Sequence, residues 1–190
     1  MTSTSPSSLS QRNVIGLPTS PFLRLFFYGS LRKGCLNHHL LYDYFGEEIV
    51  FERLVTTTIP GYLFSLMNKD YPYMTFTSPS NDLFTSIKGA HILGETYLIP
   101  SCHPGLLVLD ELEDEYSALE IDVRTLDDTY TTLRAQAYII DSKSMLTVDN
   151  LWSKVASKEL FLVENGDWYS IGNKEMKIIK EKEEEKNIIT

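Results

Sequence analysis

Short runs of β-forming residues, separated by turn residues, follow one another along most of this chain and constrain its fold more than any other feature. The first run, residues 22–28, is largely apolar and stops at Gly29-Ser30, which predicts a central strand. Further strands are predicted at residues 49–57, 62–66, 71–77, 90–99, 118–126 and 131–140. Strands should therefore form most of the ordered chain.

Helices are expected in only three places, at residues 37–45, 104–116 and 148–160. Asn37 can cap the first turn of the first helix, and Pro104 stands where the second helix should begin. A doubly wound sheet needs more crossover helices than these. The sequence therefore predicts an α+β domain with a mixed or closed sheet.

Acidic residues outnumber basic ones, 26 against 17, which gives a formal net charge of −9. Nucleic-acid binders depend on Lys and Arg to neutralise phosphates, so this balance argues against a nucleic-acid partner. The imbalance is concentrated between Asp110 and Asp128, a segment with one base, Arg124. Its nine carboxylates are Asp110, Glu111, Glu113, Asp114, Glu115, Glu120, Asp122, Asp127 and Asp128.

The ends of the chain differ in composition from its middle. The first twenty residues are rich in Ser, Thr and Pro and lack the pattern of a secretory signal, and no apolar run reaches the roughly 18–20 residues of a membrane span. Two separated cysteines, Cys35 and Cys102, indicate reduced thiols, so a cytoplasmic location is expected. The expected parts are a disordered tail (1–20), a domain (21–172) with a C-terminal extension from about residue 141, and a charged tail (173–190).

One carboxylate of the acidic segment falls on the apolar side of a helical wheel. With about 100° per residue, Glu113 falls inside the apolar arc of Leu106 and Leu109, whereas the other acids are expected to form a solvated face. Burial would raise the pKa of Glu113 and suit it to acid/base catalysis near neutral pH. Two alternatives stay open: Glu113 pairs with an Arg or Lys, or the helix ends before it.

The end of the first predicted strand, Tyr28-Gly29-Ser30-Leu31, is a second candidate site. An apolar strand that ends in Gly-Ser brings backbone N–H groups to the rim of a sheet, where they can hold a carboxylate or an oxyanion. Arg32 and Lys33 follow and add positive potential. Taken alone, the same residues also fit an ordinary turn after a buried strand.

The two candidate segments together resemble the γ-glutamylcyclotransferase-like superfamily, most closely its γ-glutamylamine cyclotransferase and plant avirulence-induced branches. The resemblance covers roughly residues 26–140 and rests on an ordered set of segments. These are Tyr28-Gly29-Ser30-Leu31, Lys33-Gly34 with Asn37-His38, Pro60-Gly61-Tyr62-Leu63, Lys88-Gly89, Gly94-Glu95-Thr96-Tyr97, Leu109-Asp110-x-x-Glu113, Tyr116, Ile121-x-Val123 and Ala137-Tyr138-Ile139. It implies a small, mixed, barrel-like sheet with flanking helices.

The resemblance also implies a function, the release of 5-oxoproline from a γ-glutamylamine or γ-glutamyl peptide without metal or coenzyme. The loop from Tyr28 to Leu31 would bind the γ-glutamyl group, Glu113 would be the general acid/base, and Tyr116 and Tyr138 would line the pocket. The spacing from Glu113 to Tyr116 is shorter and more acidic than in many members. Glu111 or Glu115 is therefore an alternative catalytic group.

Other functions are weighed against this one. A nucleophile made of Cys35 with His38 or His39 is disfavoured, because catalytic Cys/His pairs are normally joined by the fold. Cys102, His103 and His91 match no zinc spacing, so no metal is expected. The rival to the enzyme is a non-catalytic module of the same fold that binds a γ-glutamyl or other carboxylated ligand. The leaving amine and the oligomeric state stay open.

Overall fold

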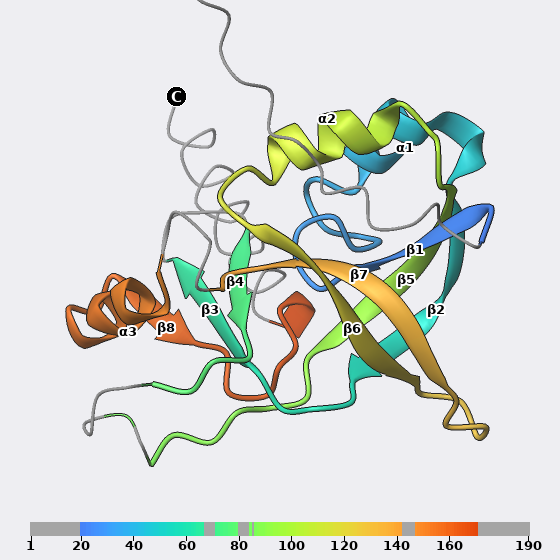
Figure 1. The fold of residues 1–190 in the computed structure, drawn as a ribbon. Coiled ribbons are helices and arrows are strands. Elements are labelled where there is room, and N and C mark those ends of the chain that lie inside the picture. The colour runs from blue at the N-terminus through green and yellow to red at the C-terminus, as the bar shows by residue number, and fades with distance from the viewer. Residues whose placement is uncertain (1–19, 67–70, 80–83, 85, 142–146, 171–190) are drawn as a thin grey trace, which may run out of the picture.

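A computed structural model describes residues 20–66, 71–79, 84, 86–141 and 147–170 (Figure 1). The strands are β1 Phe22–Phe27, β2 Val50–Thr57, β3 Tyr62–Leu66, β4 Pro72–Thr75, β5 Leu93–Pro100, β6 Ser117–Thr125, β7 Thr132–Ile139 and β8 Leu160–Leu162. The helices are α1 His39–Phe45, the short 3₁₀ helix η1 Gly46–Glu48, α2 Gly105–Leu112 and α3 Val148–Ala156.

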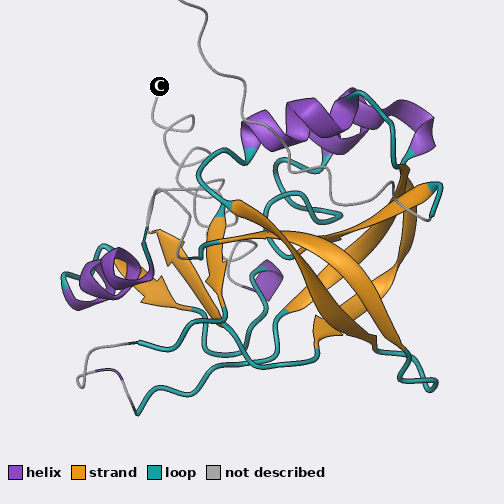
Figure 2. Ribbon diagram, viewed as in Figure 1, coloured by secondary structure: helices purple, strands orange, loops and turns teal. Residues whose placement is uncertain are grey.

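Five strands close into a barrel in the order β1-β5-β2-β6-β7, which Figure 2 shows in orange. All neighbours in the barrel are antiparallel except β1 and β7, which pair in parallel at Leu25 and Gln136. A three-stranded sheet, β4-β3-β8, lies beside the barrel, and the Ile140 N–H donates to the Met74 carbonyl between them (2.8 Å). The predicted α+β domain with a barrel-like sheet and flanking helices is confirmed.

Helices cover the barrel and the small sheet at separate places (Figure 1). The helices α1 and α2 pack together, and a Cβ on Gly105 of α2 would lie 2.3 Å from the Tyr44 carbonyl of α1, so only glycine permits this approach. Helix α3 covers the three-stranded sheet through Trp152. Its ring packs in T-shaped arrangements with Tyr62 and Phe64, at centroid distances of 5.2 and 5.0 Å.

Helix α2 ends at Leu112, four residues before the predicted end at Tyr116. Glu113 is the C-cap residue: its N–H still donates to the Leu109 carbonyl, but its φ of −100° and ψ of 32° leave the helix. The run Glu113-Asp114-Glu115 would place three negative charges at the end of the helix dipole that disfavours them. Leu112, the last residue of the helix, is 44% exposed.

Two other local predictions were wrong. Asn37 does not cap α1, which starts after His38 with no side-chain cap, because the Asn37 amide donates to the Ser30 hydroxyl instead (3.1 Å). The third helix stops at Ala156 and is followed by β8, which was not predicted. A three-residue strand has no readable period, and β8 forms because it completes the edge of β3.

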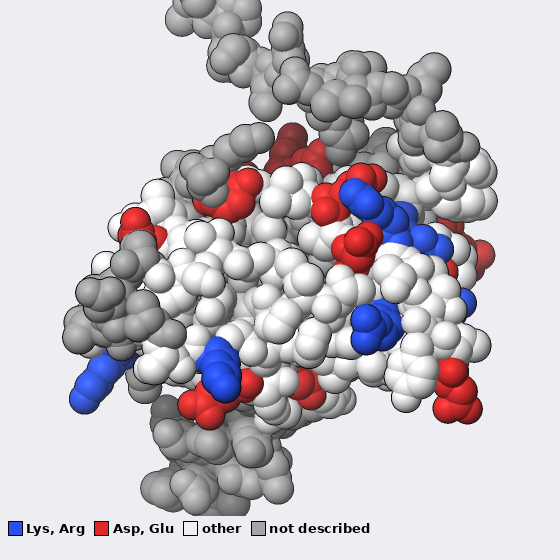
Figure 3. All heavy atoms as spheres, turned by 60° about the horizontal axis from the view of Figure 1, so that its bottom comes forward, with Lys and Arg blue, Asp and Glu red and all other residues white. Residues whose placement is uncertain are grey.

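The acidic segment continues along the outside of the β6–β7 hairpin. Arg134 lies 3.6 Å from Glu120 and 3.7 Å from Asp122, and Arg53 lies 3.5 Å from Asp127. These pairs are exposed and contribute little to stability. On the face drawn in Figure 3, acidic and basic side chains lie interspersed among uncharged ones.

Residues 1–19 and 171–190, on which the two predicted tails fall, lie outside the described part of the chain. The proposed domain limits therefore stay predictions. Within the described residues, no helix is long and apolar enough to cross a membrane.

The packing of α2 can be tested with two leucines of the same helix. Leu109 is fully buried, whereas Leu107 is 62% exposed. We expect Leu109→Ala to lower the free energy of unfolding by about 2–5 kcal/mol, because it leaves a cavity between α2 and the barrel. Leu107→Ala should change it by less than about 0.5 kcal/mol. Chemical denaturation measures both, and equal losses would contradict this placement of α2.

Candidate active site

All seven residues that the sequence analysis assigned to the site line one hollow of about 360 Å³. They are Tyr28, Gly29, Ser30, Leu31, Glu113, Tyr116 and Tyr138. A second hollow of about 590 Å³ shares Ser30, Leu31, Tyr71, Glu113 and Tyr116 with the first. Glu113 therefore lies where the two hollows meet.

Glu113 is half-buried, and desolvation raises its pKa from 4.5 to about 7. Within the described residues, no Lys or Arg forms an ion pair with it. The sequence left two alternatives open: Glu113 pairs with an Arg or Lys, or the helix ends before it. The structure shows the second, and the described residues contain no such pair. Glu113 lies just after the last residue of α2, and its side chain nevertheless lines the pocket.

The loop after β1 is held closely against β4. A Cβ on Gly29 would lie 2.6 Å from Cδ of Pro72, so glycine is needed here for close approach and not for a positive φ. The Asn37 N–H donates to the Ser30 carbonyl (3.1 Å), and His38 Nδ1 lies 2.9 Å from the Leu31 carbonyl oxygen. Among the described residues, the backbone N–H groups of Ser30 and Leu31 have no hydrogen-bond acceptor, which leaves them available to a ligand.

A sequence model of the family described as "Gamma-glutamyl cyclotransferase, AIG2-like" matches residues 25–182. The chain belongs to this family. The match confirms the resemblance drawn from the sequence motifs, and it supports an enzyme of the γ-glutamyl cyclotransferase type in the broad sense.

Two solved structures share the family's fold with this chain. An AIG2-like protein from Mus musculus is 18% identical, with a TM-score of 0.51 over 66% of this chain and 82% of that one. A uropathogenic E. coli-specific protein is 15% identical, with a TM-score of 0.53 over 80% of this chain and 96% of that one. At these identities the similarity concerns the fold alone. Comparison with the curated proteins found no match.

Three tyrosines form walls of the pocket in this member of the family. Tyr28 donates its hydroxyl to the Tyr138 carbonyl (2.7 Å), and Tyr116 donates to the Pro72 carbonyl (3.1 Å). Burial raises the pKa of both Tyr28 and Tyr116 well above 10, with a smaller contribution from the Glu113 charge. These side chains therefore stay neutral, and they line the same hollow in which burial desolvates the Glu113 carboxylate.

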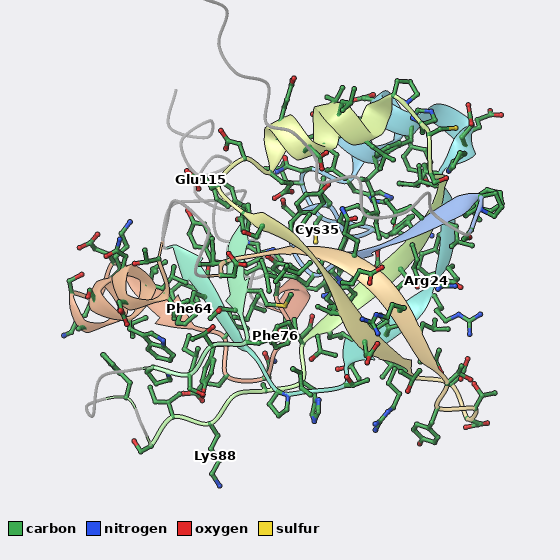
Figure 4. The ribbon with its side chains drawn as sticks, in the orientation of Figure 1. Arg24, Cys35, Phe64, Phe76, Lys88 and Glu115 are labelled. Atoms are coloured by element: carbon green, nitrogen blue, oxygen red, sulfur yellow. The ribbon has the colours of Figure 1, made fainter. Side chains whose placement is uncertain are left out.

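Two acids that were expected to face solvent instead accept hydrogen bonds from tyrosines, one of which, Tyr138, lines the pocket. Asp110 accepts a hydrogen bond from the Tyr138 hydroxyl (2.6 Å), and Glu115 accepts one from Tyr73 (3.2 Å). Figure 4 labels Glu115 between α2 and β6, above β4. For Glu115 the expectation failed because α2 ends at Leu112, before this residue. Asp110 lies within α2, and the expectation failed there because the Tyr138 hydroxyl of β7 reaches its carboxylate.

The alternatives to Glu113 are placed differently. Glu111 is exposed and lines neither hollow, whereas Glu115 lines the wider one only. Cys35 is half-buried, and burial raises its pKa to about 11, so it is a thiol and not a reactive thiolate at neutral pH. No cluster of metal-ligating side chains occurs among the described residues.

Tyr71 and Pro72 line the pocket and were missed as site residues in the sequence. Their neighbourhood was interpreted only as a strand. The aromatic-proline sequence Tyr71-Pro72-Tyr73 is the available signal, but it becomes meaningful only once the loop at Gly29 is seen against Pro72.

The raised pKa of Glu113 predicts a specific pH dependence of stability. Since the folded pKa of about 7 exceeds the ordinary 4.5, the folded protein keeps a proton that the unfolded chain loses between these values. Wild type should therefore lose about 2–3 kcal/mol relative to Glu113→Gln as the pH rises from about 4 to 8. Chemical denaturation across this range measures the difference, and a constant difference would contradict a protonated, desolvated Glu113.

Proposed function

We propose that this protein is a γ-glutamyl cyclotransferase that releases 5-oxoproline from a γ-glutamylamine or γ-glutamyl peptide, with Glu113 as general acid/base. One observation carries the proposal: a carboxyl group with a pKa of about 7 lines the same pocket as Ser30 and Leu31, whose N–H groups have no acceptor among the described residues. Family membership supports the reaction type.

The reaction needs little beyond positioning and proton transfer. The substrate's α-amine attacks its own γ-carbonyl, a C–N bond closes the five-membered lactam, and the bond to the leaving amine breaks. Because the nucleophile is tethered, a pocket that folds the γ-glutamyl chain supplies much of the acceleration. A hollow walled by tyrosines and by the backbone of the loop after β1 suits such a compact group.

Glu113 serves both proton transfers in this scheme. The α-ammonium must lose a proton before it attacks, and the leaving nitrogen must gain one as the tetrahedral intermediate collapses. A group whose pKa is about 7 is partly ionised at neutral pH, so it can accept the first proton and deliver it to the second site.

The backbone of the loop after β1 would hold the charge of the substrate or of the intermediate. Neutral N–H donors at Ser30 and Leu31 can bind the α-carboxylate or the oxyanion, and their carbonyls are already engaged by Asn37 and His38. The wider hollow meets the first at Glu113 and would receive the leaving amine, which must reach the same carboxyl group.

The proposal predicts 5-oxoproline release from at least one of γ-glutamyl-ε-lysine, γ-glutamyl amino acids and glutathione. Glu113→Gln should lower kcat by about 100-fold or more, since it removes the acid/base while keeping the size of the side chain. Glu111→Gln, at an exposed position that lines neither hollow, is the matched control and should keep full activity. Chromatographic detection of 5-oxoproline measures all three proteins.

Two results would overturn this assignment. Full activity in Glu113→Gln together with its loss in Glu115→Gln would transfer the acid/base role to Glu115. Thermal stabilisation of wild type by γ-glutamyl compounds, without turnover of any, would instead favour the non-catalytic binding module.

A further inference from the structure

The segment Gly166–Tyr169, which follows β8, is fixed to the barrel at the start of β5. Gly166 has a φ of +68°, and its carbonyl accepts a hydrogen bond from the Leu93 N–H (2.9 Å). Trp168 is 3% exposed and belongs to the barrel's core. In Figure 1 this orange-red end of the described chain returns from β8 to the middle of the molecule.

This segment supplies the counter-charge for Arg32, a buried arginine in the loop after β1 (residues 29–37, called the substrate loop below). Arg32 is 4% exposed, and its guanidinium donates to Asp167 Oδ1 at 2.8 Å. Its Nε has no hydrogen-bond partner in the described part of the chain. The Tyr169 ring lies 5.6 Å from the same guanidinium, and Gly34 packs against that ring.

The neighbouring residue is anchored independently. The Lys33 N–H donates to Glu95 Oε2 (2.8 Å), a buried carboxylate of β5 that also accepts the Tyr97 hydroxyl (2.9 Å). The N–H groups of Ser30 and Leu31, to which the proposed function assigns ligand binding, therefore directly precede two anchored residues, Arg32 and Lys33. The anchor of Arg32 is Asp167.

We propose that Asp167 is a positioning residue: through Arg32 it holds the substrate loop in the conformation that binds the γ-glutamyl group. The proposal rests on the function proposed above and extends it to a segment that lines neither hollow. A buried guanidinium without its counter-ion is costly, and the chain relieves the cost by moving Arg32 toward water. The loop that begins at Gly29 then moves with it.

The expected kinetic effect follows from the fraction of molecules whose loop is correctly placed. Apparent affinity falls in proportion to that fraction, while molecules that bind substrate still react through an unchanged Glu113. Asp167→Asn should therefore raise KM about ten-fold and change kcat by less than about two-fold. Asp167→Glu, which keeps the charge, should restore most of the affinity.

Glu52→Gln is the matched control for losing an ion pair. Glu52 of β2 pairs with Arg24 of β1 at 2.6 Å, and neither residue lines the pocket. Figure 4 labels Arg24 on the barrel wall, away from Glu115. A loss of stability alone lowers the amount of folded enzyme, so Glu52→Gln should leave KM unchanged.

Hydrogen–deuterium exchange of residues 29–37 gives a readout that does not depend on activity. Exchange there should be faster in Asp167→Asn than in Glu52→Gln or wild type, because the loop opens more often. Faster exchange with an inactive wild type would support the positioning role and refute the proposed function. Unchanged exchange, or an unchanged KM in an active enzyme, would overturn the role of Asp167.

Discussion

The parallel pairing of β1 with β7 closes the barrel, and the geometry of the site depends on it. Because these strands run the same way, the loop after β1 and the end of β7 at Tyr138 lie at the same rim. Strand β6 is antiparallel to β7, so its start, where Glu113 and Tyr116 precede it, lies at that rim too. The hydrogen bond from Tyr28 to the Tyr138 carbonyl joins the two sides.

The electrostatics of the site follow from what surrounds Glu113 at this rim. Neutral tyrosines and a backbone loop replace water around the carboxyl group, and none of the described basic side chains compensates for the loss. The acidity of the segment has a separate effect: it opposes continuation of α2 and so turns the chain at Glu113. The local charge pattern thus favours a backbone turn at Glu113. The surrounding fold then buries the carboxyl group of this residue and raises its pKa.

Much of this arrangement could be predicted from the sequence, but for unequal reasons. Strands such as β1, β2 and β6 were placed within about a residue of their ends because their residue pattern is local. Glu113 was selected by a wheel that assumed a helix to Tyr116, so the residue was placed inward for a partly wrong reason. The end of α2 depends on the charges at the helix terminus, and β8 depends on pairing with the edge of β3. The spacing of apolar residues along the sequence reports neither.

The pair Arg32 and Asp167 marks the limit of reasoning from motifs. The two residues are 135 positions apart, and nothing in either local sequence indicates the other. In the proposed function the tetrapeptide Tyr28-Gly29-Ser30-Leu31 would bind a ligand in the conformation that its surroundings impose. Part of those surroundings comes from the extension beyond residue 141. A matching tetrapeptide in another chain therefore says which groups are present and not whether they are held in place. In this chain, affinity should therefore depend on the segment behind the loop as well as on the loop itself.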